Sequence, residues 1–96
     1  MTTTARASIR HEDDRTRMTR WDFEPGQSTG RLVHAYDYVV VPVGNGRTRV
    51  IGAGGTVTVS ELRAGESYAR PAGGGGEREV VNAGSAPLVF VEIELK

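Results

Sequence analysis

The chain has 96 residues, of which 38% are hydrophobic and 25% are charged, a balance typical of one small globular domain. Its twelve basic and twelve acidic residues cancel, so its net charge gives no reason to expect nucleic acid or an anionic membrane as a partner. It contains no cysteine, which excludes disulfides and thiolate metal sites.

The N-terminal segment, residues 1–7, is mostly polar, and we expect it to be disordered, with a single domain spanning residues 8–96. This segment lacks the apolar core of a signal peptide. No apolar run in the chain reaches the roughly 20 residues of a membrane-spanning helix. The sequence therefore predicts a cytoplasmic protein.

Short runs rich in valine, threonine and aromatic residues follow one another, separated by many of the thirteen glycines and four prolines. This punctuation predicts an all-β chain. In chain order, we expect strands at residues 7–11, 15–24, 31–43, 47–51, 56–62, 67–70, 79–82 and 88–95. Strands of this length and spacing fit a β-sandwich or a β-barrel.

Alternation within two of these strands assigns side chains to faces. In the strand at 15–24, Trp21 and Phe23 share one face, and we interpret them as core or interface residues. In the strand at 88–95, the aliphatic residues share one face, and Phe90, Glu92 and Glu94 share the other. We interpret the two glutamates as a row that faces solvent or a second copy of the chain.

Two glycine-anchored stretches carry the most specific pattern in the chain. The first runs from Gly26 through His34, and the second contains Gly65, Pro71 and Gly73 and ends at Asn82. In order and spacing they resemble the paired motifs of the cupin family, and the resemblance extends over residues 8–96. It implies a small single-domain bacterial cupin, folded as an all-β double-stranded β-helix, or jelly-roll, barrel.

The positions that hold metal ligands in cupins are largely replaced in this chain. The family pattern requires two histidines and a glutamate in the first motif and a third histidine in the second. Here Leu32 and His34 occupy the two histidine positions, Tyr38 or its neighbour occupies the glutamate position, and Arg78 occupies the last one. The chain has one further histidine, His11, so three histidine ligands from one chain are impossible. We therefore expect no metal and no other cofactor.

The polar residues that remain at these positions suit metal-independent acid–base chemistry. By the two-residue period of a strand, His34, Tyr36 and Tyr38 share one face, and we predict them as catalytic residues. A guanidinium in the former metal position binds anions, so we predict Arg78 as a substrate-binding residue, with Tyr68 and Arg70 at the same mouth. The predicted ligand is a small anionic or carbonyl-containing molecule. The predicted reaction is of the isomerase, cyclase, dehydratase or decarboxylase type.

Two other interpretations fit the same residues. One is a non-catalytic small-molecule sensor or a structural dimer with a decayed site. The other is a metal-dependent cupin oxidoreductase with an unusual ligand set. In each case we expect a homodimer, because an exposed N-terminal strand favours exchange or pairing between protomers.

Overall fold

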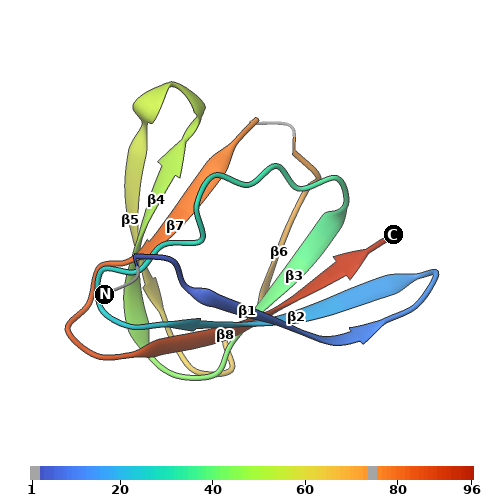
Figure 1. Ribbon diagram of the computed structural model, residues 1–96, viewed down its shortest axis with the longest axis horizontal. Helices are drawn as coiled ribbons and strands as arrows, with labels where there is room; N and C mark the ends of the chain where they lie inside the picture. The colour runs from blue at the N-terminus through green and yellow to red at the C-terminus, as the bar shows by residue number, and fades with distance from the viewer. Residues whose placement is uncertain (1–2, 74–75) are drawn as a thin grey trace.

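The protein folds as two antiparallel β-sheets (Figure 1). The computed structural model describes residues 3–73 and 76–96. The larger sheet contains, in spatial order, β1 (Arg6–Glu12), β2 (Thr16–Phe23), β8 (Leu88–Leu95), β3 (Asp37–Pro42) and β6 (Tyr68–Arg70). The smaller sheet contains β5 (Val57–Leu62), β4 (Gly46–Gly52) and β7 (Arg78–Asn82), with a short 3-10 turn (Ala53–Gly55) before β5. The predicted all-β class is confirmed. Among the described residues, no helix is long and apolar enough to cross a membrane.

The segment between β2 and β3 runs from one sheet to the other, as Figure 1 shows. Backbone bridges join Ser28 to Val81 and Leu32 to Arg78, so this segment lies along β7. The strand predicted at residues 31–43 is therefore wrong in its first half, because β3 begins only at Asp37. Residues 31–36 instead form an irregular wall between the two sheets.

The core lies between the sheets and is built largely on the inward faces of β2, β3 and β8. The rings of Phe23 and Phe90 lie 5.3 Å apart, and Phe23 retains only 1% exposure. Trp21 is also buried, so the prediction of Trp21 and Phe23 as core residues is confirmed. The buried core comprises Ala5, Trp21, Phe23, Tyr38, Val40, Leu62, Leu88 and Phe90.

The N-terminal segment is ordered from Thr3 onward, which differs from the disorder that we predicted for residues 1–7. Residues 1 and 2 lie outside the described residues. The Ala5 backbone N–H donates to the Ser28 carbonyl at 2.8 Å, and the Ser28 N–H donates to the Thr3 carbonyl at 2.9 Å. Ala5 is buried, and β1 begins at Arg6. Pairing with residues far along the chain orders a segment whose composition alone suggested disorder.

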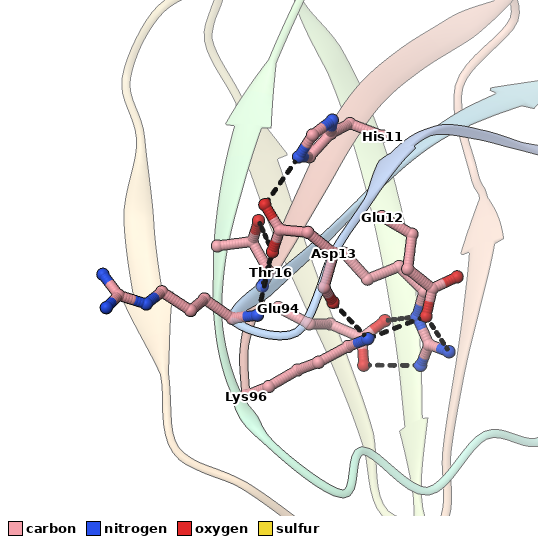
Figure 2. Close-up of polar contacts among 8 residues, drawn as sticks. His11, Glu12, Asp13, Thr16, Glu94 and Lys96 are labelled. Carbon is pink, nitrogen blue, oxygen red and sulfur yellow. Dashed lines mark hydrogen bonds and ion pairs between the residues drawn. The ribbon is translucent and has the colours of Figure 1, made fainter.

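Asp13 organises the turn between β1 and β2 (Figure 2). Its Oδ1 accepts hydrogen bonds from the backbone N–H and the hydroxyl of Thr16, at 2.8 and 3.1 Å. Its Oδ2 lies 2.9 Å from His11 Nε2. Lys96 Nζ donates to Glu12 Oε2 and to the Asp13 carbonyl, at 2.8 Å each, and so joins the end of β8 to this turn. The contact with His11 and the backbone hydrogen bonds lower the pKa of Asp13 well below its usual range.

Candidate ligand site

The inward face of β8 carries two buried carboxylates. Glu92 and Glu94 are each 7% exposed, so the prediction that they form a solvated or dimer-facing row is wrong. Both are stable inside because each has internal partners. Arg17 donates two hydrogen bonds to the Glu94 carboxylate, at 2.9 and 2.8 Å, and the Trp21 indole N–H donates to Glu92 Oε1 at 3.1 Å.

His34 lies beside the second oxygen of Glu92. Its Nε2 is 3.3 Å from Glu92 Oε2, and its ring stacks on Tyr38 with centroids 3.9 Å apart. The Gly73 N–H donates to the His34 carbonyl at 2.7 Å and so holds the backbone of the segment before β3. A Cβ at Gly73 would lie 2.8 Å from that carbonyl oxygen, so this approach requires glycine.

A pocket of about 320 Å³ opens beside His34 between the two sheets. A small recess of about 30 Å³ lies next to it. The pocket and the recess share His34, Tyr38, Arg70 and Arg78. Thr56 and Thr58 also line the pocket, whereas Tyr68 and Glu92 line the recess. The pocket and the recess therefore form one site with imidazole, phenol, guanidinium and carboxylate groups on its walls.

Two arginines give the site a positive wall. In the described part of the chain, neither Arg70 nor Arg78 lies within ion-pair distance of a carboxylate. Arg17, by contrast, pairs with Glu12 and Glu94, and Arg31 pairs with Glu77. The Arg70 guanidinium carbon lies 5.6 Å from the centre of the Tyr68 ring, a cation–π contact. Such arginines can accept a carboxylate or another oxyanion from a ligand.

Two tyrosines supply hydrogen-bond donors to the site. Burial raises the pKa of the Tyr38 phenol, and burial likewise raises the pKa of Tyr68. Both hydroxyl groups therefore stay protonated at neutral pH. A protonated phenol can donate a hydrogen bond to a ligand oxygen on which negative charge develops.

Five of the six residues predicted for the site line the pocket or the recess, and one lies apart. The five that the fold brings together are His34, Tyr38, Tyr68, Arg70 and Arg78. Tyr36 lines neither the pocket nor the recess. The alternation that placed Tyr36 beside His34 and Tyr38 assumed one continuous strand, and that strand begins after Tyr36.

Comparisons with known proteins agree with this architecture. No protein-family model matches the chain. Over 79 residues it is 43% identical to "Beta-alanine degradation protein BauB" from Pseudomonas aeruginosa, a match that covers 82% of this chain and 80% of that protein. A crystal structure of a cupin domain from Bordetella pertussis is 39% identical, with a TM-score of 0.88 and coverage of 97% and 94% of the two chains. The chain belongs to the cupin family.

A more distant cupin-like structure shares the fold alone. It is a protein with a double-stranded β-helix domain from Klebsiella pneumoniae, 22% identical, with a TM-score of 0.76. The match covers 96% of this chain and 76% of that one. The double-stranded β-helix barrel that the two sequence motifs implied is therefore confirmed.

Sequence reasoning missed Glu92 as a part of this cupin's site. The available signal was its position on the same face of the last strand as Phe90, a large aromatic residue that prefers the core. Glu92 was assigned to the outside because it is charged. Its partners, Trp21 and His34, come from distant parts of the chain, so local pattern did not reveal them.

The residues of the site do not fit a cupin metal centre. His34 and Glu92 are two potential ligands, but Leu32 and Arg78 stand at the other positions, and a guanidinium does not ligate a metal cation. Among the described residues, no group of three or more histidine, cysteine, aspartate or glutamate side chains is arranged to hold a metal. The chemistry of this site must therefore be derived from its own side chains.

Proposed function

We propose that this cupin binds a small carboxylate at Arg70 and Arg78, and that His34 exchanges a proton with the bound molecule. The observation that supports binding is the pair of guanidiniums, neither with a carboxylate partner in the described residues, that line a pocket of about 320 Å³. Guanidinium donors match carboxylate oxygens in geometry and charge. Partly buried cations gain stability when a ligand supplies the opposite charge.

The proposed chemistry is proton transfer at a carbon beside a carbonyl group. His34 is suited to it because an imidazole can accept and return a proton near neutral pH, and its Nε2 lies 3.3 Å from Glu92 Oε2, a contact that orients the ring. The Tyr38 hydroxyl and Arg78 would stabilise the enolate oxygen. Isomerisation, dehydration and cyclisation can begin with this proton removal, whereas decarboxylation of a β-keto acid forms the same enolate by releasing carbon dioxide and then takes up a proton.

The similarity to the Pseudomonas aeruginosa relative supports the same ligand class. That protein is named for β-alanine degradation. β-Alanine is a three-carbon acid, and molecules formed from it by removal of the amino group keep the carboxylate. A pocket of about 320 Å³ accommodates a molecule of this size.

Calorimetric titration with propanoate and malonate tests the carboxylate site. Replacing Arg78 by leucine should weaken binding at least about tenfold, because hydrogen bonds to charged groups contribute about 1.5–3 kcal/mol. Arg49→Leu is the matched control, since Arg49 is exposed on β4 and lines neither the pocket nor the recess. Equal affinity of the wild-type chain and the Arg78 variant, or no binding of either acid to the wild type, would sink the proposal.

A further inference from the structure

Glu92 is a buried carboxylate without a permanent cation beside it. Within the part of the chain that the structure describes, its carboxylate contacts the neutral indole of Trp21 and the imidazole of His34. Glu94, two residues further along the same face of β8, is held instead by the Arg17 guanidinium. A buried carboxylate that lacks a fixed cation favours a cation placed next to it, because burial has removed the water that would otherwise solvate its charge.

The recess beside Glu92 has the size of one small polar group. Its volume of about 30 Å³ exceeds the roughly 10–15 Å³ that a cavity needs to hold one water molecule, so a small polar group fits there. A methyl group or an ammonium group occupies a similar space. Val40, Leu62 and Phe90 provide apolar walls, Glu92 supplies a negative charge, and Arg70 and Arg78 also line the recess.

The cavity has a positive wall and a negative wall at the same time. Arg70 and Arg78 line both the pocket and the recess, and Glu92 lines the recess. Tyr38 and Tyr68 experience both charges: the two arginines act to lower the pKa of each phenol, and Glu92 acts to raise it. Both walls therefore lie close to the same two phenols, at the junction of the pocket and the recess.

We infer that the ligand is a small zwitterionic amino acid, with its ammonium group in the recess beside Glu92 and its carboxylate at Arg70 and Arg78. This inference rests on the proposed carboxylate site and adds a second recognition group to it. A second carboxylate placed next to Glu92 would be repelled by it, so a plain dicarboxylate should bind more weakly than the zwitterion.

β-Alanine and propanoate form a matched pair of probes, because an ammonium in the first replaces a methyl of similar size in the second. By calorimetric titration, the wild-type chain should bind β-alanine about ten- to a hundredfold more tightly, the effect of one added hydrogen bond to a charged group. Glu92→Gln should remove this difference, because it weakens binding of the β-alanine ammonium while propanoate binds at least as tightly as it does to the wild type. Glu94→Gln, on the same face of β8, should keep the preference, because Glu94 does not line the recess.

Equal affinity of the wild-type chain for the two probes overturns the inference, and this comparison needs no variant that might misfold. Preference for β-alanine that persists in a folded Glu92→Gln variant also overturns it. In both cases, propanoate binding that depends on Arg78 leaves the proposed carboxylate site standing. If propanoate does not bind the wild-type chain, the proposed carboxylate site itself is refuted.

Discussion

At the scale of single residues, the chain places two glutamates in nearly the same local sequence and gives them different roles. Glu92 and Glu94 are both buried on β8, but Glu94 is neutralised by a two-pronged contact with Arg17. Glu92 faces the recess and lies 3.3 Å from His34. The difference arises from the partners that other parts of the chain supply, and it leaves the Glu92 carboxylate beside the imidazole of His34.

Replacing His34 tests proton transfer directly. We expect the wild-type chain in deuterated water to accelerate the exchange of hydrogen for deuterium at the carbon beside the carbonyl of pyruvate or 3-oxobutanoate. Proton NMR measures this exchange as the loss of that carbon's proton signal. His34→Asn should slow this exchange by about a hundredfold or more, the usual contribution of a general base. His11→Asn is the control, because His11 lies on the β1–β2 turn next to Asp13.

Two results would count against His34 as the base. One is exchange at the same rate with and without the wild-type protein. The other is a His34→Asn variant that still binds the ligand and catalyses exchange at the wild-type rate. Loss of exchange together with loss of ligand affinity would be assigned to binding, so propanoate affinity is measured on the same samples.

At the scale of elements, short connections decide where the site residues lie. The Gly73 N–H and the Leu32–Arg78 bridge hold the segment before β3 against β6 and β7, and this brings His34 to the pocket. At the other side of the larger sheet, hydrogen bonds hold the β1–β2 turn. Asp13 accepts a hydrogen bond from the Thr16 N–H, and Lys96, which follows β8, donates one to Glu12. Both connections include hydrogen bonds between segments far apart in sequence.

The β1–β2 turn should make stability depend on pH in the acid range. The pKa of Asp13 is lowered in the folded chain, chiefly by His11, and that of Glu12 is lowered chiefly by Lys96. A carboxylate with a lowered folded pKa stabilises the fold above its unfolded pKa, about 4, and this stability is lost as pH falls through the folded value. The thermal unfolding midpoint of the wild type should therefore decline below about pH 4.

Asp13→Asn keeps an oxygen that can accept from Thr16 but removes the charge. We expect a lower unfolding midpoint at pH 7 than in the wild type and a shallower decline toward pH 2, both followed by circular dichroism. Asp14→Asn is the neighbouring control, because Asp14 accepts none of the hydrogen bonds that Asp13 accepts. An acid decline as steep in Asp13→Asn as in the wild type would contradict this assignment.

At the scale of the whole molecule, each sheet ends in strands with one unpaired edge. β1 and β6 end the larger sheet, and β5 and β7 end the smaller one, where Ser28 and Leu32 form isolated bridges to β7. Exposed apolar side chains lie on two of these edge strands, with Ile9 61% exposed on β1 and Val59 61% exposed on β5. Edge strands carry unpaired N–H and C=O groups that can pair with another chain.

The homodimer predicted from the sequence uses the N-terminal edge, so it should respond to changes on β1. Light scattering coupled to size exclusion should give twice the mass of one chain for the wild type. Ile9→Lys should shift the protein toward the monomer, because a lysine charge on an edge strand opposes pairing. Val59→Lys, on β5, should leave the dimer intact. A single-chain mass for the wild type would refute the prediction, and dissociation by Val59→Lys alone would place the interface elsewhere.

The sequence by itself determined the class of fold and the outline of the site. Turn residues and alternating runs predicted an all-β chain, and the spacing of the two glycine-anchored motifs predicted the cupin barrel. The same spacing placed Arg78 at a former metal position and His34 beside it, so the replacement of the metal ligands was already readable. These features depend on residue types at fixed separations along the chain, which a sequence displays directly.

Only the tertiary structure decided which side of each segment faces inward. Alternation divides a strand into two faces but does not say which face is buried, because that depends on the sheet that packs against it. The structure places Phe90 and Glu92 inward, gives Glu92 its contacts with Trp21 and His34, and leaves Tyr36 outside the pocket and the recess. A buried carboxylate is tolerated where distant strands supply its partners, and those long-range contacts form only when the chain folds.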